Sequence, residues 1–376
     1  NKIQATNKLL SSTTTMKLII LKDNFKKGLS AVERAITENT NLPILKNILI
    51  KTHNNKIRVS ATNLELGIDK FITGKIIEEG GLTIPFGTFY SIISNTDSER
   101  INLEVEKNNL IIKTDNYQAR IQGIGEDEFP IIPKIEHQNN YLEINSTVLT
   151  DALLEVVAAA QISEIRPEIS GILFDFQITV LKLVATDSFR LAEKTLYDTE
   201  FKTKFNKGFK IIVPLKTVHE IVRTIPKDEV INLHIDPNQI LFKSSDQELI
   251  SRLIDGQYPD YEQIVPKSIE TEVILNKEKF FSATKLVSSL SGKVNDIKLT
   301  LKDGAKVLEI YSANQYLGEN SYLIPAKIKG PEFKGLTFNW RYLLDGLRAI
   351  KSENIFLGAN GDNRPAIIKS PEATSL

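Results

Sequence analysis

Hydrophobic positions along the chain follow two patterns that alternate with each other. In one, apolar residues recur at the spacing of a helix face, as in Phe86, Phe89 and Ile93, and this predicts amphipathic helices. In the other, apolar and polar residues alternate singly, which predicts strands with one face on a core. The predicted helices span residues 22–37, 86–96, 146–162, 215–227, 276–293 and 340–351. The clearest alternating runs are 48–59, 173–183 and 297–310.

These patterns repeat three times with a period of about 127 residues. One landmark is a small turn after a strand, which occurs as Ala61-Thr62-Asn63, Ala185-Thr186-Asp187 and Ser312-Ala313-Asn314. Helical segments that begin after a Pro or Asn recur with nearly the same period. Independent landmarks that share one period indicate internal duplication. Each copy is itself a doubled strand–helix–strands unit, so the sequence predicts an α+β fold of three tandem domains made of six half-units.

Proline-rich segments mark the joints between the copies. Residues 129–133 close the first copy and residues 258–266 close the second, as expected of linkers that follow a final strand. We expect residues 1–15 to form a flexible extension and the domains to span 16–138, 139–266 and 267–376. The third domain is expected to lack its final strand, because its alignment with the first copy runs out near Ser370.

Composition narrows the class of protein. Of the 376 residues, 41% are hydrophobic and 25% are charged, a balance typical of soluble globular proteins. No apolar run approaches the roughly 18 residues of a membrane-spanning helix, so no membrane span is expected. The chain has no cysteine, which excludes disulfides and thiolate chemistry and favours a cytoplasmic location.

No arrangement typical of catalysis or of cofactor binding is present in the sequence. The four histidines are scattered, and the glycine-rich phosphate and dinucleotide motifs are missing. One candidate acid, Asp187, has Asn63 and Asn314 at the equivalent positions of the other copies. Asparagine caps turns but does no acid–base chemistry. We therefore expect Asp187 to cap a turn, and we expect no catalytic residue, no metal and no cofactor.

Charge is unevenly distributed, although Lys+Arg and Asp+Glu tie at 47 each. The six predicted helical segments hold 14 basic and 7 acidic residues. Ordinary solvated helix faces would account for this excess, and so would a polyanion that faces the helices. Under the second interpretation, the residues that face DNA are Lys26, Lys27, Lys216, Arg223, Lys227, Lys285 and Arg348.

Simple geometry relates such helices to duplex DNA. Packed helices lie about 8–10 Å apart, so six in a ring enclose a diameter of roughly 19 Å and twelve enclose roughly 38 Å. A B-form duplex, on the order of 20 Å wide, fits only within the larger ring. A ring of this repeat that encircles a duplex therefore needs two copies of the chain.

Three sequence motifs resemble those of a known family. They are Leu42-Pro43-Ile44-Leu45, residues 185–191 (Ala-Thr-Asp-Ser-Phe-Arg-Leu) and Tyr258-Pro259-Asp260-Tyr261. Together with the threefold repeat from Met16 to about Ser370, they resemble the bacterial DNA polymerase III beta subunit (sliding clamp) family. The resemblance implies a head-to-tail homodimeric ring around duplex DNA, with helices lining the ring and sheets outside. It implies no chemistry, only a tether that makes the polymerase processive without sequence preference.

The resemblance also implies a peptide-binding groove between the second and third domains. Its partners would be the DNA polymerase III alpha subunit, the clamp loader and other proteins that carry a clamp-binding motif. Apolar residues would form the pocket, and Arg190 would supply charged donors at its rim. By the matching motifs, the groove residues are Arg166, Ile169, Thr186, Ser188, Phe189, Arg190, Leu191, Pro259, Gln263, Ile264 and Tyr342.

For ring closure, we expect the outer strand Tyr117 to Ile124, with Arg120 and Ile121, to form the dimer edge of the first domain. Two other classes of function remain open at this point. A repeat-built enzyme would need an acid–base pair that the sequence does not offer. An interaction scaffold that does not bind DNA would differ in assembly state and in retention on circular duplex.

Overall fold

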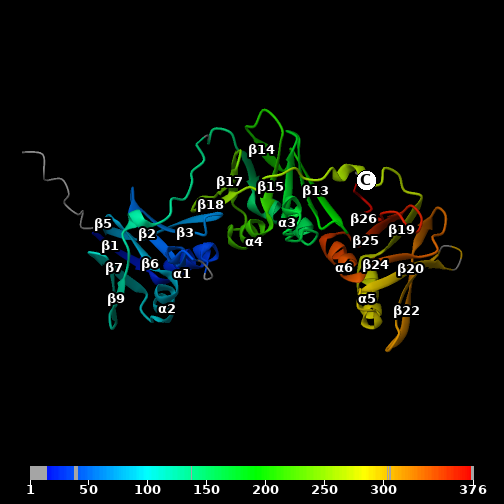
Figure 1. Cartoon of the computed structure of the whole chain (residues 1–376), viewed down its shortest axis with the longest axis horizontal. Coiled ribbons are helices and arrows are strands. Elements are labelled where there is room, and N and C mark those ends of the chain that lie inside the picture. The colour runs from blue at the N-terminus through cyan, green and yellow to red at the C-terminus, as the bar shows by residue number, and fades with distance from the viewer. Residues whose placement is uncertain (1–14, 38–40, 137, 303, 305, 374–376) are drawn as a thin grey trace, which may run out of the picture. The chain divides into compact units, whose positions relative to one another are not determined.

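The computed structural model describes residues 15–37, 41–136, 138–302, 304 and 306–373, so nearly all of the expected extension 1–15 lies outside the described residues. Within this range, six α-helices each follow directly on a strand, as the six predicted half-units require (Figure 1). The helices are α1 (Lys22–Val32), α2 (Phe86–Asn95), α3 (Ser146–Val157), α4 (Leu215–Thr224), α5 (Lys277–Val287) and α6 (Trp340–Ala349). The predicted α+β class is confirmed.

The helices begin where the sequence predicts, to within one residue, but several end earlier. Ile36, Ala160 and Leu290 continue the apolar spacing, yet they lie beyond the ends of α1, α3 and α5. Ile36 is extended and Leu290 closes a short 3-10 helix. The observed helices carry 10 basic and 6 acidic residues. The positive excess is therefore smaller than the longer predicted segments gave, but it keeps its sign.

The chain divides into two compact units, and each is described by itself. Unit 1 comprises the described residues up to 149 together with 198–207 and 219–253. Its five-stranded sheet has the order β5 (Lys75–Glu78), β1 (Met16–Leu21), β7 (Arg100–Glu106), β8 (Asn109–Lys113), β9 (Gln118–Gln122). Its nine-stranded sheet has the order β14 (Phe201–Thr203), β10 (Leu142–Asn145), β16 (Val230–Asp236), β17 (Gln239–Lys243), β18 (Gln247–Arg252), β4 (Leu66–Ile72), β3 (Lys56–Thr62), β2 (Asn47–His53), β6 (Gly81–Pro85).

The nine-stranded sheet joins strands of the first and second copies, because β4 pairs directly with β18. The pairing is antiparallel and places Lys70 opposite Gln247 and Asp69 opposite Glu248. Lys70 Nζ also lies 2.6 Å from a carboxylate oxygen of Asp246. This β4–β18 junction is a continuous hydrogen-bonded connection between two copies of the repeat.

The two faces of β4 have different roles. Ile68, Lys70 and Ile72 share one face, and α1 packs on that side, with Ile72 against the backbone of Gly28. Asp69 and Phe71 therefore lie on the opposite face, because side chains alternate along a strand. On the helix side, the rings of Phe25 and Phe89 meet edge to face at 5.2 Å and join α1 to α2.

Unit 2 comprises residues 150–197, 208–218 and those from 254 onward. Its first sheet has the order β13 (Leu191–Tyr197), β12 (Val180–Thr186), β11 (Gly171–Phe176), β15 (Phe209–Pro214). Its second has the order β23 (Lys327–Lys329), β19 (Thr271–Asn276), β25 (Asn354–Ala359), β26 (Ile367–Lys369). Its third has the order β22 (Gly318–Pro325), β21 (Val307–Asn314), β20 (Asp296–Lys302), β24 (Leu336–Asn339).

The core of the third copy draws on both helices and on the second and third sheets of unit 2. Phe280 of α5 is fully buried, and Leu343 and Leu347 of α6 belong to the same cluster. Both helices begin with a side-chain cap: Asn276 Oδ1 accepts from the Lys279 amide and Asn339 Oδ1 accepts from the Arg341 amide, each at 3.0 Å. Such caps satisfy amides that a helix leaves open at its start.

A buried histidine should make the stability of unit 1 depend on pH. His234 of β16 is 5% exposed, its ring lies 5.7 Å from that of Tyr141, and its Nδ1 has no hydrogen-bond partner among the described residues. Burial lowers the pKa of His234, and Lys243 lowers it further. The folded state therefore resists protonation, and stability is lost as the pH falls below the unfolded value of about 6.5. Replacing His234 with Phe should reduce the fall in the urea midpoint between pH 7.5 and 5.5. An unchanged pH dependence in this variant would contradict the assignment.

Candidate functional site

The turn that follows β12 is held by its own side chains. Asp187 Oδ1 accepts hydrogen bonds from the amides of Phe189 and Arg190, at 2.9 and 3.0 Å. Thr186 Oγ1 donates to the Arg190 carbonyl at 2.7 Å, and Ser188 takes a left-handed backbone conformation with φ of 76°. These bonds fix the direction in which the next side chains leave the turn.

The same cap occurs in all three copies. Asn63 Oδ1 accepts from the amides of Glu65 and Leu66, and Asn314 Oδ1 accepts from those of Tyr316 and Leu317. The predicted turn-capping role of Asp187 is confirmed, since asparagines do the same work at the two equivalent positions.

Arg190 is fixed by three neighbours. Its Nε donates to Asp187 Oδ2 at 3.0 Å, its Nη1 donates to Asp345 Oδ2 of α6 at 2.7 Å, and its guanidinium lies 4.2 Å from the ring centre of Tyr342. Two of its donor atoms are therefore engaged within the chain. These two bonds use two of the five N–H donors of a guanidinium and hold the turn against α6, so the expectation that Arg190 supplies charged donors at the rim stays a prediction.

An apolar cluster lies beside this turn. Ile169 is buried at 3% exposure, and half-buried Leu191 packs against the cluster that contains it. Tyr258 donates its hydroxyl to the Val184 carbonyl at 3.4 Å, and burial raises the pKa of Tyr258 above its ordinary range. The remaining members of the cluster are Leu173, Val184, Ile212, Tyr261, Ile254 and Val265.

Large apolar side chains stand exposed around this cluster. Phe189 is 84% exposed and Ile264 is 58% exposed. Arg166 Nη1 donates to Ser188 Oγ at 2.9 Å, so the loop before η4 (Pro167–Ile169) lies against the turn. Half-buried Pro259 and exposed Gln263 come from the linker. The structure thus brings Arg166 to Ser188, Arg190 to Tyr342 and Leu191 to the Ile169 cluster.

A basic hollow of about 480 Å³ lies between α1 and α4 in unit 1. Lys26, Lys27 and Arg223 line it together with Lys70 and Asp23. The structure therefore gathers three of the seven residues expected to face DNA. The other four do not line this hollow; they are Lys216, Lys227, Lys285 and Arg348.

Carboxylates beside two of the residues expected to face DNA partly neutralise their positive charge. Arg223 Nη1 lies 3.7 Å from a carboxylate oxygen of Glu220, whose pKa is raised mainly by burial. Arg348 Nη1 donates to Asp345 Oδ1 at 2.8 Å. Lys26 and Lys27 form no ion pair with a described residue within 4 Å. These two lysines therefore contribute the least compensated charge of the hollow.

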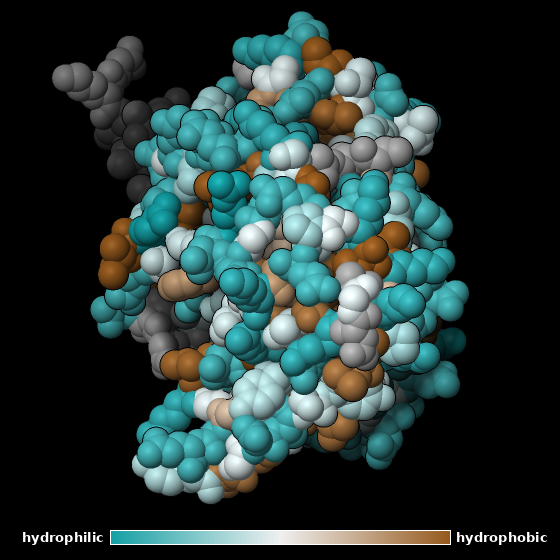
Figure 2. Space-filling view, turned by 90° about the vertical axis from the view of Figure 1, so that its right-hand side faces the viewer, coloured by the Kyte–Doolittle hydropathy of each residue, from teal (hydrophilic) through white to brown (hydrophobic). Residues whose placement is uncertain are grey.

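Strands β9 and β22 are edge strands of their sheets within the described residues. In the five-stranded sheet of unit 1, β9 is an edge; the Arg120 side chain is 65% exposed and pairs with Glu106 at 3.5 Å, whereas Ile121 is buried. In unit 2, β22 is an edge with Tyr322 and Leu323 exposed. Sequence reasoning missed β22, although its exposed apolar residues were a signal. On the face shown in Figure 2, hydrophobic residues stand in small separate groups among hydrophilic ones.

The described residues contain no group of three or more His, Asp or Glu side chains placed to hold a metal ion. None of the helices in the described ranges is long and apolar enough to cross a membrane.

Comparison with protein families identifies the three copies in order. The description "DNA polymerase III beta subunit, N-terminal domain" matches residues 16–133. The central domain of the same subunit matches residues 143–260, and its C-terminal domain matches residues 262–376. The three matches follow the threefold repeat that the sequence predicts.

Individual relatives are similar along nearly their whole length. The Beta sliding clamp of Bacillus subtilis is 28% identical over 374 residues, which cover 96% of this chain and 97% of the relative. That of Synechococcus elongatus is 28% identical over 361 residues and covers 94% and 95%. The crystal structure of the DNA polymerase sliding clamp from Bacillus subtilis aligns with a TM-score of 0.90 at 26% identity, covering 96% and 97%. A DNA polymerase III beta subunit from Thermotoga maritima aligns at 0.85 with 21% identity over 96% and 97%, which shows the fold alone.

Proposed function

Because the chain belongs to the DNA polymerase III beta subunit family, we propose that two copies close head to tail into a sliding clamp around duplex DNA. The clamp performs no chemistry of its own. It tethers the DNA polymerase III alpha subunit to its template and so makes synthesis processive, in the cytoplasm. The observation that carries this proposal is the β4–β18 junction. The repeat contains a second pair of strands equivalent to these two, β22 and β9, and each is an unpaired edge of its sheet within the described residues.

The repeat relates β22 to β4 and β9 to β18. Residues Ile72 and Ile324 are both buried and hold equivalent positions in the pairing of β4 with β3 and of β22 with β21. In the same way, Gln118 pairs with Lys113 as Glu248 pairs with Lys243. Long unpaired edges invite pairing with another chain. Two copies of the protein can therefore join β22 of one to β9 of the other by the rule that joins β4 to β18.

The equivalence predicts the register of this contact between chains. Gly67 lies opposite Ile250 in the β4–β18 junction, and their counterparts are Glu319 and Arg120. Lys70 lies opposite Gln247, and their counterparts are Tyr322 and Tyr117. The transferred register thus sets a carboxylate opposite a guanidinium and one tyrosine opposite another, both favourable cross-strand pairs. The expected dimer edge at Arg120 gains a named partner in this way.

The basic hollow between α1 and α4 supports the proposed DNA face. Three of its four basic side chains, Lys26, Lys27 and Arg223, sit on helices, where they would meet phosphates rather than base edges, so binding would have no sequence preference. The further proposed contacts are Lys216 of α4, Lys227 in the turn after α4, Lys285 of α5 and Arg348 of α6. The strength of such contacts falls steeply with salt.

Replacing Lys26, Lys27 and Arg223 together with Glu should weaken binding to a 30-base-pair duplex at low salt by at least tenfold. Three lost phosphate contacts should also reduce the slope of log affinity against log salt by about 3. Fluorescence anisotropy across a salt series measures both quantities. The matched control replaces Lys75, Lys107 and Lys202 with Glu and carries the same change of net charge. Equal losses in the two variants would contradict a specific face.

The apolar cluster at Ile169 and the exposed side chains around it support peptide docking in unit 2. An extended segment with apolar anchors would cover Leu191, Phe189 and Ile264. Arg190, held by Asp187 and Asp345, would form a fixed wall rather than a mobile donor. The polymerase subunit, the clamp loader and other proteins that carry the docking motif are the proposed occupants.

Topology distinguishes the clamp from a scaffold that does not bind DNA. Gel filtration of the protein assembled on nicked circular plasmid should show it eluting with the DNA at high salt, and linearising the plasmid should release it. A scaffold would not elute with either form. Retention on linear duplex equal to that on circles would contradict encirclement.

A further inference from the structure

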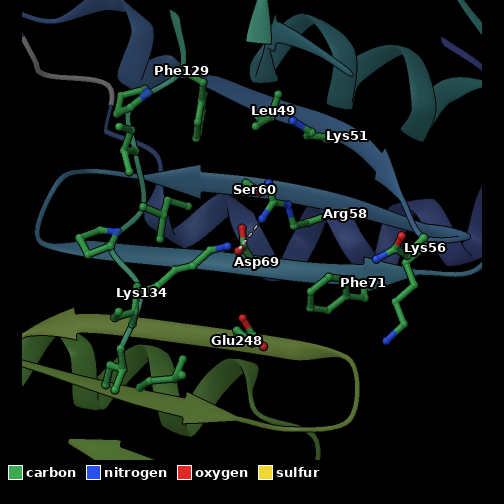
Figure 3. Close-up of a pocket in the computed structure, with 18 of the residues that line it drawn as sticks. Leu49, Lys51, Lys56, Arg58, Ser60, Asp69, Phe71, Phe129, Lys134 and Glu248 are labelled. Atoms are coloured by element: carbon green, nitrogen blue, oxygen red, sulfur yellow. Dashed lines mark hydrogen bonds and ion pairs between the residues drawn. The ribbon is translucent and has the colours of Figure 1, made fainter. Parts of the chain in front are cut away.

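A cavity of about 730 Å³ lies on the outer face of the nine-stranded sheet in unit 1. Strands β2, β3, β4 and β18 form its floor, and the linker around residues 129–135 crosses over it (Figure 3). The floor residues alternate along their strands, so they lie on the face opposite α1. The cavity is therefore separate from the basic hollow between α1 and α4.

The second copy contains a filled counterpart of this cavity. There, Tyr258 and Tyr261 of the linker belong with Val184 to the apolar cluster that contains Ile169. In the first copy the position of Val184 is taken by Ser60, since Val184 pairs with Glu193 as Ser60 pairs with Asp69. The repeat thus places a polar, open version of the cluster under the first linker.

Two buried residues at the centre of the cavity each leave one polar atom without a hydrogen-bond partner among the described residues. Asp69 is 8% exposed and Ser60 is 1% exposed. Asp69 Oδ2 lies 3.5 Å from Arg58 Nη1, but Asp69 Oδ1 and Ser60 Oγ have no hydrogen-bond partner among the described residues. Burial raises the pKa of Asp69. A buried polar atom without a partner costs stability, and a bound group would relieve that cost.

Positive charge prevails around this centre. Four basic side chains line the cavity against the two acidic ones, Asp69 and Glu248, and one of the four, Lys51, is paired with Glu126 at 3.1 Å. Lys134 extends from the linker toward Asp69, and Lys56 lies over the ring of Phe71 at 5.5 Å (Figure 3). Neither lysine has a carboxylate of a described residue within 4 Å. Glu248, by contrast, is neutralised by Lys243 at 2.9 Å.

Apolar surface accompanies the charge. Leu49 and Ile250 line the floor at 7% exposure each, and Ile131 of the linker is 91% exposed at the cavity mouth. A partner that offers only negative charge would leave this surface uncovered. A segment with both carboxylates and an apolar side chain would match both features.

We propose that this cavity is a second docking site, which takes an extended acidic segment of a partner protein carrying an apolar anchor. The carboxylates of the segment meet Lys56 and Lys134, and its anchor packs beside Phe71 under the linker. A backbone or side-chain N–H of the segment donates to Asp69 Oδ1, a bond that the amide oxygen of asparagine could accept equally. The site does not depend on the groove of unit 2, so the two can fail separately.

The probe is a fluorescein-labelled hexapeptide of four glutamates, one leucine and one phenylalanine, measured by anisotropy on the full chain. The double replacement Lys56→Glu and Lys134→Glu should weaken it at least tenfold, because it reverses two charges near the bound carboxylates. The matched double replacement Lys75→Glu and Lys107→Glu should leave the affinity within twofold. Asp69→Asn should tighten it severalfold, because it removes the opposing charge and keeps the shape.

Other outcomes overturn the proposal. A preference for the same peptide with lysine in place of glutamate would make this a site for cations. Displacement by inorganic polyphosphate at equal charge concentration would make it a general anion site. Equal weakening by both double replacements would show only long-range charge, and loss of the peptide in Leu191→Ala would place it in the unit 2 groove. Weakening by Asp69→Asn would make that residue a required carboxylate and contradict the acidic ligand.

Discussion

Replacing Leu323 with proline should convert the proposed dimer to a monomer at micromolar concentration. The equivalent residue in the first copy is Phe71, whose amide donates to the Asp246 carbonyl across the β4–β18 junction at 2.8 Å. By this equivalence the Leu323 amide points toward the partner chain, and proline both removes it and obstructs pairing. The cost is about 2 kcal/mol per junction and about 4 kcal/mol for a ring with two junctions, roughly a thousandfold in the dimer equilibrium. Analytical ultracentrifugation measures the change.

Leu323→Ala is the matched control, because it removes the side chain and keeps the amide; it should dissociate far less. The register is tested separately by charge exchange. Arg120→Glu and Glu319→Arg should each weaken the dimer, and the two together should restore it. Two single variants that weaken the dimer without mutual rescue would place β9 and β22 in a different register.

Replacing Leu191 with alanine should weaken a peptide from the tail of the polymerase alpha subunit about 30-fold or more in calorimetric titration. Leu191 is half-buried against the Ile169 cluster, so a docked segment would complete its burial. Truncating a buried anchor at a hot spot costs about 2 kcal/mol or more, which is the stated factor.

The matched control is Leu286→Ala, which truncates a leucine of α5 that is 59% exposed and should leave the peptide affinity unchanged. Leu191→Ala should also leave the dimer intact, because it lies on neither proposed edge. Loss of the dimer with unchanged peptide affinity would mean that the groove lies elsewhere.

The local spacing of hydrophobic residues predicted most of the helices and strands. It could not predict which strands pair when they lie far apart in the sequence. Helix starts were predictable because each apolar helical run begins directly after a strand, as at Phe86 and Trp340. Helix ends were not, since Ile36 and Leu290 keep the apolar spacing after the helical hydrogen bonds stop. The β4–β18 pairing joins residues about 180 positions apart, and alternation along one strand does not reveal which strand lies beside it.

Within the candidate site, the sequence predicted the capped turn at Asp187 but not the distant side chains that contact it. The repeat revealed the capping role of Asp187, because Asn63 and Asn314 do the same work. The tie from Arg190 to Asp345 spans 155 residues and has no local signal. The cavity under the first linker was also missed, since Ser60 and Asp69 look like ordinary outward positions of a strand until the linker covers them.

The β4–β18 junction has a consequence for how such a ring would open. Its two strands belong to one chain and stay covalently connected, so an opened junction closes again at the high effective concentration of a tethered pair. The proposed contact between β9 and β22 lacks that tether. Mechanical work applied to the ring would therefore separate the contacts between chains first and leave the junction within each chain closed. Covalent connectivity, rather than the strength of the strand pairing, would decide where DNA enters.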